Sequence, residues 1–260
     1  TAYEILPSLV GSEMCIRDMS RILRVKIRNG LMDSPLVSNE NLTLIGSAEH
    51  RSVGRQAVRE SVVVLKDDNI LPISKDLQTL VVAGKGADNL GMQCGGWSID
   101  WQGGQGDITI GTTILDGIKK AVSDSTEIIY SEDGSDVVPN SDNIAVVVIG
   151  EDPYTEWFGD KENLDLNDDD INLINSLKDK GYKVAVLLIS GRPMNVADHI
   201  GQWDAFAAIW LPGTEGDGVS DILFGDFNSK GRLSFPWPID TEDGSNADKD
   251  NLLFDIGYGL

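Results

Sequence analysis

Residues 144–160 read Ile-Ala-Val-Val-Val-Ile-Gly-Glu-Asp-Pro-Tyr-Thr-Glu-Trp-Phe-Gly-Asp, and this stretch decides the fold class. Residues 144–149 are apolar without interruption and rich in β-branched side chains, which is typical of a strand buried on both faces. Residues 150–160 form a connection longer than a strand-to-helix turn needs, and they carry aromatic and acidic side chains. The stretch predicts an inner strand of a parallel sheet with an enlarged loop at its carboxyl end.

The same alternation of a β-branched run, a glycine-bearing loop and an apolar helical stripe recurs between about residue 79 and residue 211. It is typical of βαβ units. The other predicted strands are 79–83, 127–130, 183–189 and 206–210. We therefore predict an α/β fold, a three-layer sandwich with a mainly parallel sheet and helices on both faces.

Start and stop signals bound the predicted helices. Asp168, Asp169 and Asp170 place negative charge at a helix N-terminus, and Gly181 stands where a C-terminal cap is expected. Other predicted helices are one that opens the domain within 47–66 and runs into strand-like residues 61–65, one over 114–122, and one that Gly225 ends. We assign residues 51–240 to the sandwich and 241–260 to a C-terminal tail.

The N-terminal residues do not follow this alternation. Residues 19–30 form a basic predicted helix that ends at Gly30, and a linker leads on to about residue 50, so we interpret 19–50 as the end of a preceding domain. Residues 7–18 resemble translated adapter sequence from the ends of assembled transcripts, and the chain does not begin with Met. We expect residues 1–18 to be non-native or fragmentary; the alternative is an ordinary entry to the helix.

Two tryptophans, Trp97 and Trp101, lie in the long glycine-rich connection between residues 84 and 112. Loops at the carboxyl ends of parallel strands are where such sheets bind ligands. Flat aromatic rings suit the apolar faces of sugar rings, and neighbouring glycines allow close backbone approach. The pair is a candidate sugar-binding site; the alternative is that both rings cap the core beneath the loop.

Glu156 lies in the 150–160 loop beside Tyr154 and Trp157. A carboxyl beside aromatic surface loses hydration, which raises its pKa toward the range that suits a general acid. We expect Glu151, Asp152 and Asp160 to act in the same direction by like-charge repulsion. Glu156 is thus a candidate catalytic acid, and the alternative is a solvated surface carboxylate.

The composition argues against several kinds of partner. The 260 residues carry a net charge of −21, which disfavours nucleic acid and acidic membranes, and no apolar run is long enough to span a bilayer. With two cysteines and two histidines in the chain, we expect no disulfide scaffold and no transition-metal site.

We also expect no cofactor. Gly84-Lys-Gly86 lacks the remaining features of a dinucleotide motif, and residues 212–218 lack the Gly-Lys-Ser/Thr ending of a phosphate loop. Residues 165–170 begin like a calcium loop but lack its glycine, and Ser176 stands where the final Glu should be.

Taken together, these segments resemble the C-terminal sandwich domain of glycoside hydrolase family 3, closest to its plant exo-β-glucanase type. The resemblance covers residues 19–260. The motifs that carry it are Glu60–Lys66 with Leu71-Pro72, Ala87–Gly91, Gln93–Trp97, Trp101–Gly103, Gly111–Leu115, Gly150–Glu156, Leu188–Pro193, Trp210–Gly216, Leu223–Phe227 and Gly231–Leu233.

The resemblance implies a retaining enzyme that hydrolyses terminal β-D-glucosyl residues from β-glucosides or β-glucan oligosaccharides. An N-terminal barrel would supply the Asp nucleophile, and Glu156, at the end of Pro-Tyr-Thr-Glu, would be the acid/base residue. Trp97 and Trp101 would bind the leaving-group sugar, and helix 19–30 would close the barrel. The resemblance also favours a secreted or extracellular protein.

The sequence departs from the family because no barrel is present, so we expect this piece alone to be inactive. A retaining site needs two carboxyl groups about 5 to 5.5 Å apart, and Glu156 is one of them. Two other readings stay open. The chain is a non-catalytic carbohydrate-binding module in the first and a flavodoxin-like nucleotide or receiver domain in the second.

Overall fold

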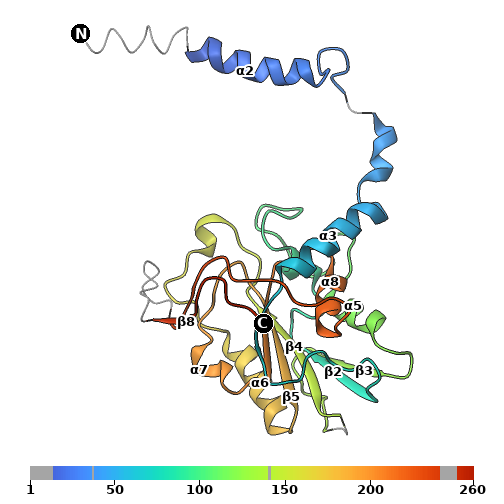
Figure 1. Cartoon of the computed structure of the whole chain (residues 1–260), viewed down its shortest axis with the longest axis vertical. Coiled ribbons are helices and arrows are strands. Elements are labelled where there is room, and N and C mark those ends of the chain that lie inside the picture. The colour runs from blue at the N-terminus through green and yellow to red at the C-terminus, as the bar shows by residue number, and fades with distance from the viewer. Residues whose placement is uncertain (1–13, 37, 140–141, 241–250) are drawn as a thin grey trace, which may run out of the picture. The chain divides into compact units, whose positions relative to one another are not determined.

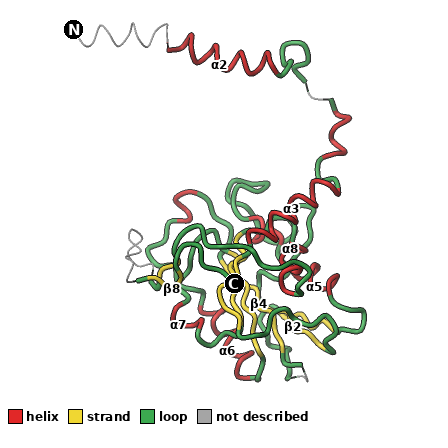
Figure 2. Tube along the Cα trace, in the orientation of Figure 1, coloured by secondary structure: helices red, strands yellow, loops and turns green. Residues whose placement is uncertain are grey.

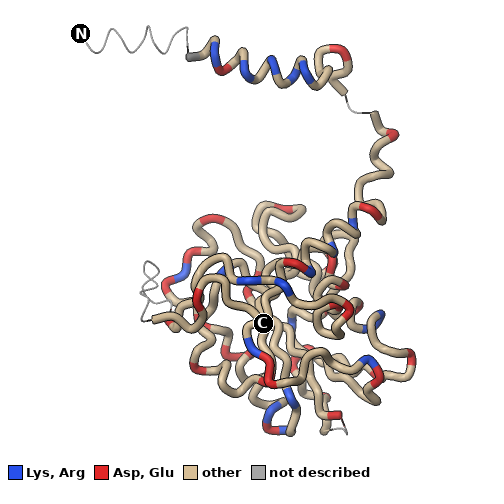
Figure 3. Tube along the Cα trace, viewed as in Figure 1, with Lys and Arg blue, Asp and Glu red and all other residues tan. Residues whose placement is uncertain are grey.

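The computed structural model describes residues 14–36, 38–139, 142–240 and 251–260, and the chain divides into two compact units, Thr1–His50 and Arg51–Leu260 (Figure 1). In the first unit, helix α2 (Met14–Arg28) precedes the short 3-10 helix η2 (Asn39–Leu44). Basic residues follow one another along α2, as Figure 3 shows. The expected helix 19–30 therefore begins earlier, at Met14, and Gly30 follows it in the left-handed conformation at φ +69°.

Six strands form the sheet of the second unit, in the order β1-β6-β5-β4-β2-β3. Their bounds are β1 Val63–Asp67, β2 Thr79–Ala83, β3 Glu127–Ser131, β4 Ile144–Gly150, β5 Lys183–Ile189 and β6 Ala205–Trp210. Strands β2 to β6 pair in parallel, and only the edge strand β1 runs antiparallel to its neighbour β6. The predicted mainly parallel sheet is confirmed.

Helices cover both faces of this sheet, so the expected three-layer α/β sandwich is also confirmed (Figures 1 and 2). On one face lie α3 (Ala48–Ser61), α4 (Leu90–Cys94), α5 (Ile114–Ala121) and α8 (Gly216–Leu223). On the other lie α6 (Asp168–Asp179) and α7 (Ala197–Ile200). Along β4, Val146 packs with the first set of helices and Val147 with the second, because successive strand side chains point to opposite faces.

The helix signals read from the sequence correspond to observed caps. The Asn167 side chain accepts a hydrogen bond from the Asp169 N–H at 3.0 Å and thereby caps the acidic first turn of α6. Gly181 ends that helix at φ +88°, a conformation that glycine adopts without a Cβ penalty. Gly225 follows α8 in the same way, at φ +75°.

The C-terminal residues belong to the sandwich unit in part. Strand β8 (Leu252–Phe254) pairs with β7 (Trp237–Pro238), and the N–H of Leu260 donates to the carbonyl of Val64 in β1 at 2.9 Å. Residues 251–260 of the expected tail therefore pack on the sheet domain. Residues 241–250 lie outside the described residues, as does the segment 1–13 of the expected non-native region.

Candidate functional site

Two long loops leave the carboxyl ends of neighbouring parallel strands. Strand β2 leads into residues 84–112, which contain α4, and β4 leads into residues 151–160, which contain the 3-10 helix η3 (Glu156–Gly159). Because β2 and β4 pair directly, the two loops emerge side by side at one end of the sheet (Figure 1). This is the end at which α/β sheets bind ligands.

The two loops pack against each other without room for side chains at their closest points. A Cβ atom on Gly96 would overlap the carbonyl of Tyr154, and one on Gly103 would press on Pro153. The backbone N–H of Thr155 donates to Oε1 of Gln102 at 3.2 Å, which links the residue before Glu156 to the residue after Trp101. The predicted acid and the predicted tryptophans are therefore carried on one joined surface.

Trp97 and Trp101 lie together, with ring centroids 6.4 Å apart and ring planes at 57°. Trp97 is 68% exposed and Trp101 is 38% exposed, so the alternative that both rings cap the core is wrong for Trp97 in particular. The structure adds two rings that the sequence did not group with them. The ring centroid of Trp101 lies 5.7 Å from that of Trp157 and 5.8 Å from that of Phe158, and these two residues directly follow Glu156.

Glu156 is the first residue of η3 and lies in the left-handed conformation at φ +49°. Trp97 shares this uncommon backbone region at φ +60°. Non-glycine residues rarely adopt it, and where they do the surrounding structure must hold them there. Glu156 is exposed, so the burial that the sequence predicted for its carboxyl is not supplied by the described residues of this unit.

A buried ion pair holds the loop that carries Glu156. The Glu151 side chain, only 3% exposed, accepts from Nη2 of Arg192 at 2.6 Å and from the Ser190 hydroxyl at 2.8 Å. Nη1 of Arg192 donates to the carbonyl of Gly159 at 2.6 Å. Arg192 thus connects the first residue after β4 to the last residue of η3.

Tyr154 completes this arrangement, because the Arg192 guanidinium lies 4.5 Å from its ring centroid. Burial and the charge of Glu151 raise the pKa of Tyr154 to about 12, so its hydroxyl stays protonated at neutral pH. Burial alone would also raise the pKa of Glu151, but the hydrogen bonds from Arg192 and Ser190 outweigh it and hold that pKa below its usual range.

These contacts correct one expectation and reveal a missed role. Glu151 and Asp152 were expected to act on Glu156 as like charges, but Glu151 is paired with Arg192 and Asp152 lies 3.1 Å from the amine of Lys85. The positioning role of Arg192 was missed. The sequence did carry a signal for this role. Glu151 directly follows β4, and Ser190 and Arg192 follow the neighbouring strand β5, so an acidic and a basic side chain leave adjacent strands at the same end of the sheet.

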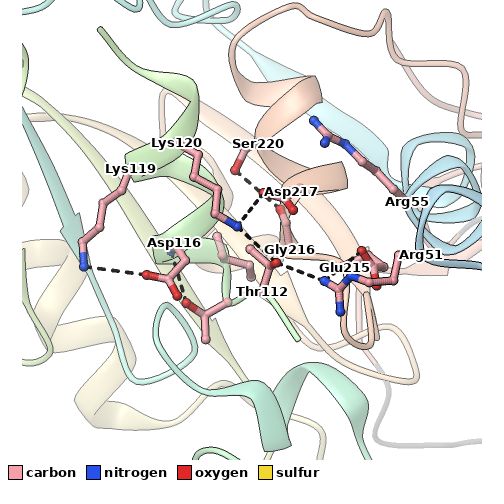
Figure 4. Close-up of polar contacts among 12 residues, drawn as sticks. Arg51, Arg55, Thr112, Asp116, Lys119, Lys120, Glu215, Gly216, Asp217 and Ser220 are labelled. Carbon is pink, nitrogen blue, oxygen red and sulfur yellow. Dashed lines mark hydrogen bonds and ion pairs between the residues drawn. The ribbon is translucent and has the colours of Figure 1, made fainter. Parts of the chain in front are cut away.

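A second polar cluster fixes the far end of the 84–112 loop. Arg51 and Lys120 approach the hydroxyl of Thr112 from two sides, at 3.1 and 3.3 Å, as Figure 4 shows. Arg51 also pairs with Glu215 at 3.3 Å, and the buried Gln93 side chain donates to the carbonyls of Thr112 and Gly213. The motif at residues 212–218 therefore has a packing role in this structure.

Within the described ranges, no group of three His, Cys, Asp or Glu side chains could hold a metal ion. The described helices also include none that is long and apolar enough to cross a membrane.

The sequence profile of the Glycosyl hydrolase family 3 C-terminal domain matches residues 62–260. The chain belongs to this family. The family 3 domain is similar to an exo-1,3/1,4-β-glucanase from a Pseudoalteromonas species, with a TM-score of 0.80 and 40% identity over 92% of this chain and 32% of that chain.

Curated relatives include β-glucosidases and β-xylosidases. The lysosomal β-glucosidase of Dictyostelium discoideum is 31% identical over 247 residues, which cover 86% of this chain and 30% of that protein. The periplasmic β-glucosidase of Salmonella typhimurium is 29% identical over 279 residues, covering 90% and 36%. The family 3 domain thus spans about a third of the length of these relatives.

Proposed function

We propose that this chain is the C-terminal part of a retaining β-glucosidase or exo-β-glucanase that removes terminal β-D-glucosyl residues. Glu156 is its acid/base residue, and Trp97 and Trp101 bind the leaving-group sugar. The observation that carries the proposal is the joining of the two loops, because it brings the exposed carboxyl and the exposed tryptophans to one end of the sheet.

In this mechanism Glu156 donates its proton to the glycosidic oxygen as the bond to the sugar breaks. The resulting carboxylate then takes a proton from the water that hydrolyses the glycosyl-enzyme ester. The Glu151–Arg192 pair keeps η3 in place, so that the carboxyl is held where the leaving oxygen arrives. The second carboxylate, the nucleophile, comes from a barrel domain such as the resemblance implies.

A second domain that covers the loop would also shield Glu156 from water, which the second unit, Arg51–Leu260, does not do by itself. Glu156 is exposed on this unit, and the domain that carries the nucleophile would cover the loop and exclude water from the reacting carboxyl. The isolated chain is therefore inactive in this proposal.

A chimera tests the proposal. Residues 51–260 replace the matching third of the Pseudoalteromonas exo-β-glucanase, whose fold they share. The chimera should cleave 4-nitrophenyl β-D-glucoside, and NMR of the first glucose released should show the retained β configuration. The isolated chain should not cleave this substrate. A folded chimera without activity would contradict the proposal.

A non-catalytic carbohydrate-binding module is the second candidate, and the exposed ring cluster is the observation that favours it. Calorimetry with laminari- or cello-oligosaccharides separates the two. Micromolar affinity of the isolated chain supports a binding module, whereas affinity no tighter than millimolar supports a site completed by another domain.

A further inference from the structure

Two large aromatic side chains, Trp157 and Phe158, stand exposed directly after the candidate acid. Trp157 is 63% exposed and Phe158 is 61% exposed, although this unit buries other large rings such as Trp237 and Phe206 completely. Together with Trp97 and Trp101 they form one continuous surface, in which neighbouring centroids lie 5.7 to 6.4 Å apart. Contiguous exposed apolar surfaces mark interaction or ligand-binding sites, whereas single exposed apolar residues need no explanation.

The turn that carries the two rings is held at both ends. Glu156 precedes them in the left-handed conformation, and the N–H of Asp160 donates to the carbonyl of Trp157 at 3.1 Å. Arg192 donates to the carbonyl of Gly159, the residue after Phe158. A ligand that binds these rings therefore orders little additional backbone, which lowers the entropic cost of binding.

The ring planes separate this surface into two parts. Trp157 and Phe158 are tilted by only 33° from each other, but Trp101 stands at 69° to the first and 81° to the second. A sugar ring that lies flat on the Trp157–Phe158 pair would not lie flat on Trp101, because Trp101 stands steeply inclined to both rings. The pair is thus available to a second sugar ring.

We propose that Trp157 and Phe158 form a further sugar subsite, which binds the second sugar of the leaving group beyond the one held by Trp97 and Trp101. The inference rests on the proposed function and extends it to a substrate class: β-glucan oligosaccharides whose leaving group contains at least two sugars. A disaccharide substrate leaves this subsite empty.

The chimera described above tests the subsite through the length of the substrate. In laminaribiose the leaving group is one glucose, and in laminaritriose it is two. The double substitution Trp157→Ala and Phe158→Ala should lower the ratio of kcat/KM for laminaritriose to that for laminaribiose by about tenfold, the factor that ~1.4 kcal/mol produces. The single substitution Trp157→Tyr, with Phe158 unchanged, should keep most of the ratio of the unsubstituted chimera, because tyrosine also presents a flat ring.

Ile110→Ala is the matched control. Ile110 is 89% exposed on the other loop and lines a separate cavity with Asp88 and Asp116, so its removal should leave the ratio unchanged. An unchanged ratio in the double variant would overturn the inference, and so would an equal loss on both substrates. A folded chimera without glucosidase activity would instead contradict the proposed function itself.

The 260-residue chain gives a second measurement that needs no chimera. Because the subsite consists of residues of this chain alone, laminaritriose at millimolar concentrations should shift the indole N–H resonance of Trp157. The Phe158→Ala substitution should weaken that shift, and Ile110→Ala should not. If the Trp157 resonance does not move at the highest soluble concentration of laminaritriose, the inference is overturned.

Discussion

The backbone N–H of Thr155 donates to the side-chain oxygen Oε1 of Gln102 across two loops that are far apart in the sequence. Thr155 directly precedes the candidate acid, and Gln102 directly follows one of the candidate sugar-binding tryptophans. This contact and the close backbone packing beside it turn two long connections into a single surface. The proposed chemistry depends on that surface being held in one arrangement.

Gly96→Ala should therefore separate the loops. A Cβ atom at Gly96 would overlap the carbonyl of Tyr154 and the methyl group of Thr155, so the loops must move apart. We expect a loss of about 1 to 3 kcal/mol in the free energy of unfolding, as for other overpacked sites, and a changed near-ultraviolet circular dichroism spectrum from the tryptophan cluster. Gly201→Ala is the control, because nothing lies within 4 Å of the added Cβ atom.

Arg192→Ala should be strongly destabilising. It leaves the carboxylate of Glu151 buried without its main partner, a change that costs about 3 to 5 kcal/mol in comparable sites. Lys161→Ala removes an exposed amine at 3.5 Å from the same carboxylate and should cost less than about 1 kcal/mol. Denaturant unfolding of both variants measures the difference, and equal losses would contradict the positioning role of Arg192.

The pH dependence of the Arg192 variant has a defined sign. In the unsubstituted chain the hydrogen bonds to Glu151 lower its pKa, so their stabilisation is present above the unfolded pKa and is lost as the pH falls through the folded one. Without Arg192, burial dominates and raises that pKa. The difference in stability between the two proteins should thus be larger at pH 7 than near pH 4.

Asp170→Asn should stabilise the protein at neutral pH. Burial raises the pKa of Asp170 to about 6, against the attraction of Lys85 and the hydrogen bond with the Gly150 backbone, while Asp152 and Asp169 raise it further. A carboxyl with a raised folded pKa destabilises the folded state as the pH rises past its unfolded pKa, by ~3 kcal/mol at pH 7. Thermal unfolding should show a higher Tm for the variant at pH 7 and no gain at pH 4.

An outcome in the opposite direction would be informative about the same residue. If Asp170→Asn were less stable than the unsubstituted chain at pH 7, the carboxylate would be favourably paired in its ionised form. The proposed burial penalty would then be wrong.

The strands were predictable because their signal is local. Residues 144–149 and 184–189 are apolar on both faces, and a chain with such runs between helical stripes has few alternatives to a covered parallel sheet. The helix ends at Gly181 and Gly225 were predictable for the same reason, since left-handed backbone favours glycine. The short elements α4, α7, β7 and β8 were not predicted, because segments of this length are too short to show a hydrophobic periodicity.

The candidate site was predictable only in part. Glu156, Trp97 and Trp101 could be selected from the sequence, but their joining depends on where Gly96 and Gly103 let two backbones meet. The exposed state of Glu156 agrees with the solvated alternative and not with the expected loss of hydration, since neighbouring aromatic residues in sequence do not by themselves cover a carboxyl.

The most direct test of the account is the Glu156→Gln substitution in the chimera, measured on substrates with different leaving groups. We predict that hydrolysis of laminaribiose, whose leaving group needs a proton, falls by about a hundredfold or more, while 4-nitrophenyl β-D-glucoside retains much more of its bond-cleavage rate. Undiminished hydrolysis of laminaribiose by the glutamine variant would contradict the assignment of Glu156 as the acid.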